Sequence, residues 1–210
     1  MIGVIDYRAG NAPSVGYALE RLGIAHRLVD DPDALEGCDR IVLPGVGAAR
    51  ATLDSLRSAG FVEPLTTLVC EERLPFLGIC IGLQVLFDHT EEGDVAGLGW
   101  VPGVVRRFAT DQSVPQIGWN SVHLRRSHPV TADFPEGGHC YFVNSFYAAP
   151  SVSDHVLGDT SYGVDFCSVV ARDNIVATQF HAEKSGPLGL GILTAFAAWD
   201  GTAPAATGAG

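Results

Sequence analysis

A cysteine between two glycines is the feature of this chain that points most directly to chemistry. Cys80 lies between Gly78 and Gly82, after an apolar stretch that begins at Leu74. The G-x-C-x-G spacing is typical of a nucleophile held on a tight turn between a strand and a helix. The glycines remove side chains that would collide in such a turn, and a helix N-terminus beside the sulfur favours the thiolate. We therefore predict that Cys80 is a nucleophile and that the backbone N–H of Ile81 helps to form an oxyanion hole.

A histidine and a carboxylate follow another apolar stretch, 175–180, far along the chain. His181 and Glu183 are separated by one residue, so in an extended segment their side chains lie on one face. A thiol nucleophile needs a base that takes up its proton and returns it to the leaving group, and histidine is the usual one. The carboxylate fixes the imidazole tautomer and stabilises the imidazolium. Taken singly, these residues are more often structural, but together they predict a Cys80–His181–Glu183 triad. An α/β-hydrolase would place the acid before the histidine.

The elements that would position these residues alternate in the first half of the chain. Four apolar runs are predicted to be strands: 2–5, 27–29, 40–43 and 74–79. Four amphipathic stretches are predicted to be helices: 12–22, 49–58, 61–73 and 81–89. This alternation predicts an α/β fold, with a mostly parallel central sheet and helices on both of its faces.

The second half of the chain changes character. Strand-like runs follow one another with few helices between them: 98–108, 117–124, 139–147, 166–171 and 175–180. Such a series predicts antiparallel strands added to the sheet. A last helix is expected at 188–199. We predict a single domain over residues 1–200, and a frayed tail at 201–210 because that segment is small and polar.

Composition excludes several classes of protein. The chain has 210 residues, of which 47% are hydrophobic and 18% charged, which is a globular composition. A formal net charge of −11 disfavours nucleic acid and anionic lipid as partners. No apolar run reaches the ~20 residues that span a bilayer, and the first residues lack the basic segment of a signal peptide. We therefore expect a cytoplasmic protein that binds neither nucleic acid nor membrane.

The remaining sequence signals for cofactors are negative. The five cysteines, at 38, 70, 80, 140 and 167, are odd in number and irregularly spaced, with no CxxC. This pattern predicts neither a disulfide framework nor a zinc site. The chain also lacks the glycine-rich fingerprints for nucleotide phosphates and dinucleotides. We expect no metal and no cofactor.

Five segments together resemble the triad-type glutamine amidotransferases, and within them the glutaminase subunits of imidazole glycerol phosphate synthases. GICIGLQ at 78–84 is close to GICLGMQ, and QFHAEKS at 179–185 is close to QFHPEKS. IDYRAGN at 5–11 is similar to the opening I-D-Y-G-x-G-N, and LPGVG at 43–47 matches. VPQIGWN at 114–120 is like VPHIGWN, the segment most specific to these subunits. The resemblance covers about 2–199.

The resemblance implies a fold and a function. The fold would be that of the class I glutamine amidotransferases, which is flavodoxin-like. Cys80, His181 and Glu183 would hydrolyse L-glutamine to glutamate and ammonia. In a heterodimer, the ammonia would pass to a (β/α)8-barrel cyclase that forms imidazole glycerol phosphate in histidine biosynthesis. Further residues would have these roles: Val46 with Ile81 in the oxyanion hole; Gly45, Gly47, Gln84, Ser145 and Phe146 in glutamine binding; Asn11 and Lys184 at the partner interface.

Three departures from the family pattern matter. Arg8 replaces a small residue, Ala182 replaces a proline, and Asn144 stands where the family has histidine. Because a neutral amide can neither carry charge nor shuttle a proton, Asn144 leaves open a paralogue that supplies ammonia to a different synthase. Two further hypotheses are a non-catalytic regulatory subunit and a thiol peptidase or hydrolase on the same fold. The intact triad and Gln84 argue against the regulatory subunit, and the oxyanion and glutamine motifs fit an amidase better than a peptidase.

Overall fold

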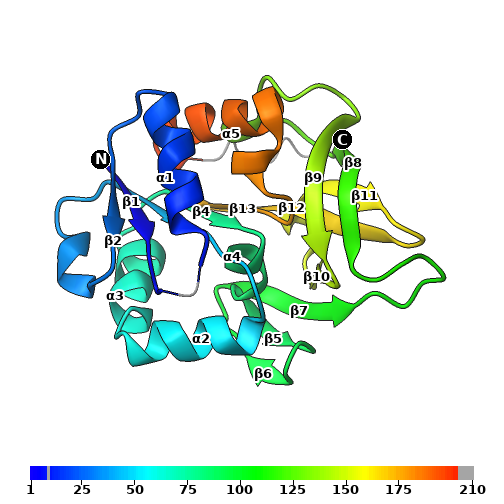
Figure 1. Cartoon of the computed structure of the whole chain (residues 1–210), viewed down its shortest axis with the longest axis horizontal. Helices are drawn as coiled ribbons and strands as arrows, with labels where there is room; N and C mark the ends of the chain where they lie inside the picture. The colour runs from blue at the N-terminus through cyan, green and yellow to red at the C-terminus, as the bar shows by residue number, and fades with distance from the viewer. Residues whose placement is uncertain (9, 203–210) are drawn as a thin grey trace.

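The computed structural model describes residues 1–8 and 10–202 (Figure 1). Most of the predicted tail, 203–210, lies outside the described residues. The centre is a parallel group in the order β2-β1-β3-β4-β13. Its strands are β2 (His26–Val29), β1 (Ile2–Ile5), β3 (Arg40–Leu43), β4 (Phe76–Ile79) and β13 (Ile175–Thr178). β1, β4 and β13 are buried along their whole length, as expected for apolar parallel strands covered on both faces.

Helices cover both sides of this parallel group (Figure 1). α1 (Ala12–Arg21) and α5 (Gly186–Ala198) lie on one side, and α2 (Ala49–Ser58) and α3 (Val62–Thr66) on the other. α3 continues as a π-helical turn, η2 (Thr67–Glu71), in which the Glu72 N–H donates to the Thr67 carbonyl at 2.9 Å. The helix predicted at 61–73 is therefore confirmed, with a wider last turn than an α-helix.

The second half adds further strands that pair mostly antiparallel, as predicted. Their bounds are β5 (Phe87–Thr90), β6 (Val95–Ala96), β7 (Val101–Arg107), β8 (Gln116–Leu124), β9 (Gly138–Asn144), β10 (Phe146–Pro150), β11 (Val156–Ser161) and β12 (Asp165–Arg172). β12, β10 and β7 extend the sheet beyond β13 through antiparallel pairs, and β11, β8 and β9 form a branch from β12. β13 is antiparallel to β12 but parallel to β4, so it belongs to the parallel centre as well. β5, β6 and β11 were not predicted from the sequence, and β5 pairs parallel with β7.

The strand predicted at 139–147 is two strands that separate at Ser145. β9 pairs with β8, whereas β10 pairs with β7 and β12. The chain thus changes partners at this residue, and the Ser145 carbonyl accepts a hydrogen bond from the Phe108 N–H at 3.1 Å. This change of partners leaves Ser145 outside both strands.

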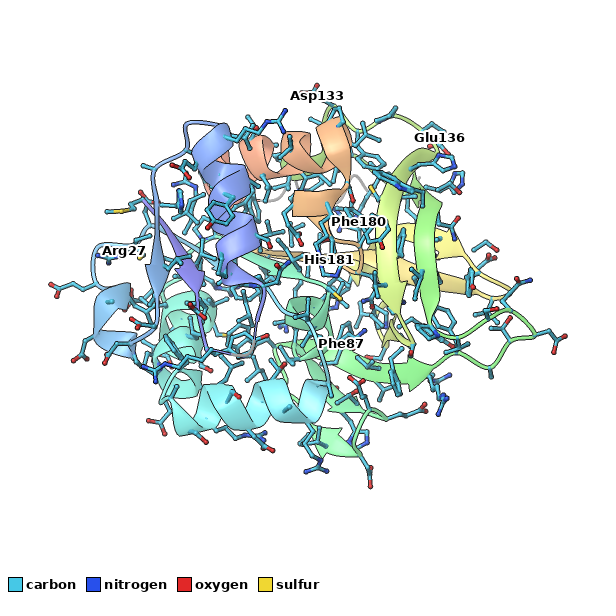
Figure 2. All side chains as sticks on the ribbon, in the orientation of Figure 1. Arg27, Phe87, Asp133, Glu136, Phe180 and His181 are labelled. Carbon is cyan, nitrogen blue, oxygen red and sulfur yellow. The ribbon has the colours of Figure 1, made fainter. Side chains whose placement is uncertain are left out.

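The helix predicted at 81–89 is wrong beyond its first turn. α4 covers only Ile81–Gln84, and the chain re-enters the sheet as β5. The carbonyls of Val85, Leu86 and Phe87 accept hydrogen bonds from the N–H groups of residues 98, 101 and 99, at 2.8, 3.0 and 3.2 Å. Phe87 is fully buried in the interior (Figure 2). Strand pairing with a distant segment therefore replaces the helical hydrogen bonds that the local sequence favours.

Short 3-10 helices complete the chain: η1 (Pro32–Leu35), η3 (Pro129–Thr131), η4 (Ser153–His155) and η5 (Ala182–Lys184). Within residues 1–8 and 10–202, no helix is long and apolar enough to cross a bilayer.

Candidate active site

Cys80 lies on a strained turn at the carboxyl end of β4. Its φ of 56° and ψ of −107° are unusual for a residue with a side chain, and its N–H donates to the Thr178 carbonyl at 2.7 Å. A Cβ atom on Gly82 would lie 1.9 Å from the Leu43 carbonyl oxygen, and one on Gly78 would lie 2.5 Å from the Gly82 oxygen. Both glycines are therefore required by close backbone approach, as the sequence spacing predicted.

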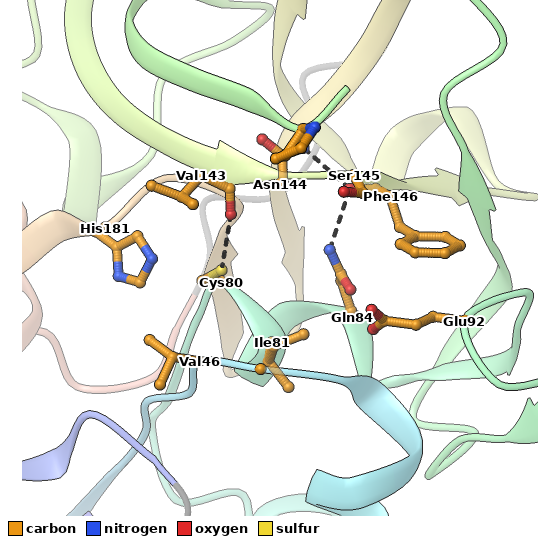
Figure 3. A pocket seen from close by; sticks show the side chains of 12 residues that line it. Val46, Cys80, Ile81, Gln84, Glu92, Val143, Asn144, Ser145, Phe146 and His181 are labelled. Carbon is orange, nitrogen blue, oxygen red and sulfur yellow. Dashed lines mark hydrogen bonds between the residues drawn. The ribbon is translucent and has the colours of Figure 1, made fainter. Parts of the chain in front are cut away.

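His181 and Glu183 form a buried pair beside this turn. Nδ1 of His181 lies 2.9 Å from Oε1 of Glu183, and their side chains are only 3% and 1% exposed. The backbone is not extended as predicted: His181 precedes the 3-10 turn η5, which brings the two side chains together. The imidazole faces Cys80 across the site (Figure 3), near the middle of the molecule (Figure 2).

The surroundings of His181 favour its protonated form. Burial alone lowers the pKa of an imidazole, because it penalises the charged state. Hydrogen bonding and electrostatic interaction with Cys80 and Glu183 outweigh burial and raise the pKa of His181 to about 9. At neutral pH the site therefore stabilises an imidazolium beside the Cys80 sulfur.

Backbone and hydroxyl contacts hold the histidine in place. The His181 N–H donates to the Tyr141 carbonyl at 3.0 Å. The Ser185 hydroxyl donates to the His181 carbonyl at 2.7 Å and accepts the Tyr141 N–H at 2.9 Å. β9 and η5 thus fix the position of the imidazole from both sides of its backbone.

A cleft of about 230 Å³ opens over Cys80. Its lining includes most of the residues that the sequence assigned to the site: Val46, Gly47, Cys80, Ile81, Gln84, Ser145, Phe146 and His181. Pro115, Val143, Asn144 and Glu92 complete the lining. Gly45 does not line the cleft. A Cβ atom at Gly45 would lie 2.6 Å from the Tyr7 hydroxyl and 3.0 Å from Cβ of Ile81, so this glycine allows the loop to pack closely behind the cleft wall.

Gln84 projects from α4 and is only 2% exposed. Its Nε2 donates to the Phe146 carbonyl at 3.1 Å and to Oε1 of Gln179 at 3.0 Å. Asn144 donates to the same Phe146 carbonyl at 2.9 Å (Figure 3). Among the described residues, the buried Oε1 of Gln84 has no hydrogen-bond partner, which leaves one acceptor free at the cleft.

Glu92 is a cleft residue that the sequence did not reveal. Its Oε2 accepts the N–H of Ala49, the first residue of α2, at 2.7 Å. Burial raises the pKa of the Glu92 carboxyl, and the bond from Ala49 opposes this rise. The residue lies in a turn after β5, inside the region predicted to follow a helix, and no local pattern marks it. Its carboxylate faces the end of the cleft opposite His181 (Figure 3).

The two predicted interface residues occupy different environments. Asn11 precedes α1, and its Nδ2 donates to Oε1 of Glu183 at 2.5 Å. Lys184 follows Glu183 in η5 and is exposed. Both therefore lie next to the triad carboxylate, one in contact with it and one at the adjacent surface.

The chain matches a known family over nearly its whole length. The model of glutamine amidotransferase class-I matches residues 4–197. "Imidazole glycerol phosphate synthase subunit HisH" of Geobacter metallireducens is 45% identical, over 93% of this chain and 97% of that protein. The proteins of the same name from Chloroflexus aurantiacus and a Synechococcus species are 44% and 46% identical, over 95% and 93% of this chain and 96% and 92% of their own lengths.

Solved structures agree with this fold. A crystal structure of glutamine amidotransferase superposes with a TM-score of 0.74 at 22% identity, over 93% of this chain and 98% of that chain. A chain in the structure of PurLQS from Thermotoga maritima superposes with a TM-score of 0.71 at 18% identity, over 93% of this chain and 96% of that chain. The chain therefore belongs to the class-I glutamine amidotransferases, and within them to the family of imidazole glycerol phosphate synthase subunit HisH.

Proposed function

We propose that this chain hydrolyses L-glutamine to glutamate and ammonia at Cys80, as the glutaminase subunit of an imidazole glycerol phosphate synthase in histidine biosynthesis. The observation that carries this proposal is the buried His181–Glu183 pair facing a strained cysteine over a small cleft. The site alone supports a thiol amidase. The sequence identity to imidazole glycerol phosphate synthase subunits HisH supports the more specific assignment to this synthase. The five free thiols fit a reducing, cytoplasmic setting.

The arrangement supports a two-step hydrolysis. The Cys80 thiolate attacks the side-chain carbonyl carbon of glutamine, and the N–H groups of Ile81 and of the loop at Val46 stabilise the oxyanion. The His181 imidazolium gives its proton to the departing nitrogen, so ammonia leaves and a γ-glutamyl thioester remains on Cys80. The neutral imidazole then takes a proton from water, which attacks the thioester and releases glutamate. Glu183 stabilises the cation in both steps.

The cleft offers complementary groups to the rest of the substrate. The Glu92 carboxylate suits the α-ammonium group of glutamine. The backbone at Ser145 and Phe146, where β9 passes to β10, suits the α-carboxylate. The free Oε1 of Gln84 can accept a hydrogen bond from the substrate amide. Together these groups favour a free amino-acid amide, because they complement its α-ammonium and α-carboxylate groups.

An exposed apolar surface beside the site suits the cyclase, which we take to be a (β/α)8 barrel. Ile117 and Trp119 of β8 are 64% and 56% exposed, and they lie directly opposite Val143 and Tyr141 of β9. Large exposed apolar groups clustered on one ribbon are typical of a protein interface. We call these four residues the ribbon patch. Val143 also lines the cleft, so a partner on this patch would cover the mouth from which ammonia leaves.

A labelling experiment tests the nucleophile. A glutamine analogue with an electrophilic carbon should modify Cys80 in equal molar amount and spare the other four cysteines, read by peptide mass spectrometry. Cys140 is the matched control, since burial raises the pKa of its thiol to about 12 and disfavours the thiolate. Labelling that persists in Cys80→Ala would refute the assignment. If a purified barrel cyclase does not stimulate ammonia release, the assignment to an imidazole glycerol phosphate synthase is refuted.

A further inference from the structure

A continuous series of side-chain amides joins the nucleophile to the glutamine-binding backbone. Nε2 of Gln179 lies 3.8 Å from the Cys80 sulfur, within hydrogen-bonding range for sulfur. Oε1 of Gln179 accepts from Nε2 of Gln84 at 3.0 Å, and the same Nε2 donates to the Phe146 carbonyl at 3.1 Å. Nδ2 of Asn144 donates to that carbonyl as well, at 2.9 Å. We call Gln179, Gln84 and Asn144 the amide series.

The contacts themselves fix the orientation of each amide. If Gln179 were reversed, its oxygen would face the lone pairs of the sulfur and its NH₂ would face the NH₂ of Gln84. Only the observed orientation satisfies both neighbours, so the neighbours determine which end of the amide carries the nitrogen. The two N–H bonds of Gln84 are then both used, and its oxygen is left free for the cleft.

The far end of the series locks the backbone beside the substrate. A carbonyl oxygen has two lone pairs, and Gln84 and Asn144 occupy both at Phe146 (Figure 3). The three amides are between 0% and 5% exposed, so water does not compete for these bonds. The loss of any one of these hydrogen bonds is therefore expected to destabilise this part of the site.

We propose that Gln179 and Asn144 are positioning residues at the two ends of the amide series, which holds the sulfur of Cys80 and the glutamine-binding backbone in one geometry. Gln179 directs an N–H at the sulfur and so supports the thiolate before glutamine arrives. Asn144 fixes the Phe146 carbonyl and so sets the affinity for glutamine. This inference rests on the proposed function for its substrate, but the sulfur end can be tested without glutamine.

This geometry explains why asparagine can replace the family histidine at position 144. A histidine at this position can also donate one N–H to the Phe146 carbonyl, when the correct ring nitrogen carries the proton. The carboxamide makes the same bond at every pH. Gln116, which replaces another histidine of the family pattern, lies directly opposite Asn144 in the β8–β9 pair. The two changes thus occupy neighbouring positions of one ladder.

The test uses the full chain with its cyclase and compares Gln179→Met, Asn144→Ala and the double variant. Asn144→Ala should raise KM for glutamine about tenfold and leave kcat within about twofold. Gln179→Met should lower kcat and also raise KM about tenfold, because Gln84 loses its acceptor. Both variants release the same carbonyl, so the double variant should have a KM within about threefold of the larger single effect. Asn144→His should restore KM to within about threefold of the original.

A second measurement needs no glutamine. Alkylation of Cys80 by iodoacetamide should slow about tenfold in Gln179→Met and stay unchanged in Asn144→Ala. If Gln179→Met does not fold, Gln179→Glu keeps the length and the acceptor but presents no N–H to the sulfur at neutral pH, and alkylation should slow equally.

Asn174 supplies a matched control for structural damage. This buried asparagine donates to the Val69 and Leu74 carbonyls at 2.9 and 2.7 Å, at the opposite end of β13 from Gln179. Asn174→Ala should lower the melting temperature and leave KM unchanged. Fully multiplicative KM effects at 144 and 179, or unchanged alkylation in both Gln179 variants, would overturn the inference. A chain that alkylates as expected but hydrolyses no glutamine would instead refute the proposed function.

Discussion

The carboxamide of Asn11 donates from Nδ2 to Oε1 of Glu183, 2.5 Å away and 172 positions along the chain. The same oxygen is hydrogen-bonded to Nδ1 of His181. Asn11 immediately precedes α1, where asparagine commonly caps its own helix, but its side chain makes no capping bond there. The residue that the family resemblance placed at the partner interface therefore also holds the carboxylate of the triad.

Substitution of Asn11 should impair catalysis more than binding. We predict that Asn11→Ala lowers kcat for glutamine about tenfold with KM within about twofold, because Glu183 loses a donor that helps to orient it. Asn11→Asp should be worse, since a second carboxylate would face Glu183. Steady-state kinetics with the cyclase present measure both. Ser14→Ala, on the first turn of α1, is the control. An unchanged kcat in Asn11→Ala would show that this hydrogen bond does not matter.

The triad partners should differ in their effects. His181→Ala should abolish hydrolysis by several orders of magnitude, whereas Glu183→Gln should be milder, because the carboxylate orients and stabilises but does not move the proton. Removing its charge also removes one cause of the raised pKa of His181, which is about 9. The alkaline limb of the kcat profile should therefore move to lower pH in Glu183→Gln. A limb that stays in place, or equal losses in the two variants, would contradict these roles.

The turn at Cys80 could be predicted because its requirements are local. A nucleophile on a tight turn needs small neighbours two residues away on either side, and Gly78 and Gly82 provide them within five consecutive positions. The pairing of His181 with Glu183 is equally local, although a 3-10 turn and not an extended segment achieves it. The parallel pairing of the central strands followed from the alternation of strands and helices in the first half of the chain.

The features that the sequence did not reveal depend on distant partners. Residues 85–87 are apolar in a way that suits either a helix or a strand, and hydrogen bonds from residues 98–101 decide the outcome. Glu92 lies at the cleft because its carboxylate accepts a hydrogen bond from the N–H of Ala49, 43 positions earlier. Gln179 precedes the triad histidine in a familiar motif, but its contact with the sulfur appears only once β13 lies beside β4. No periodicity encodes contacts of this kind.

Lys184 offers a direct test of the partner face because it is the sole lysine of the chain. An amine-reactive acylating reagent can modify only Lys184 and the N-terminal amine. Binding of the cyclase should protect Lys184 and leave Met1 reactive, because Met1 precedes β1 at the amino edge of the parallel sheet, whereas the site lies at the carboxyl edge. Peptide mass spectrometry separates the two sites. Equal labelling of Lys184 with and without the cyclase would remove this residue from the interface.

The same lysine should couple hydrolysis to synthesis. Lys184→Ala should weaken glutamine-dependent formation of the product and spare formation from added ammonium salt, because free ammonia bypasses the glutaminase. A charge pair buried at an interface is worth about 2–5 kcal/mol, and one at the rim far less. The Arg21→Ala variant, on α1 away from the triad, is a suitable control. If both nitrogen sources are affected equally, Lys184 has no coupling role.

His128 should make the stability of the fold depend on pH. The ring is 1% exposed and packs edge-on against Trp199, with 5.0 Å between ring centres. Its Nδ1 accepts the Val130 N–H at 3.1 Å at the start of η3. Burial, with a smaller effect from Arg126, lowers the pKa of His128 from 6.5 to about 4. The unfolded chain therefore binds a proton that the folded chain rejects at any pH between these two values.

The sign follows from this difference. Above pH 6.5, His128 is neutral in both the folded and the unfolded chain, and its contribution to the free energy of unfolding is fully present. Between pH 6.5 and about 4, His128 is protonated in the unfolded chain before it is protonated in the folded chain, so the free energy of unfolding falls. The full loss is about 3 kcal/mol and about 2 kcal/mol is lost by pH 5. His128→Asn keeps an acceptor for the Val130 N–H and cannot titrate, so its deficit relative to the original chain in urea unfolding should shrink from pH 7.5 to 5. Asn174→Ala, which removes a buried side chain that does not titrate, is the control, and its stability deficit should not change with pH. A deficit in His128→Asn that is constant with pH would show that His128 is not the group responsible.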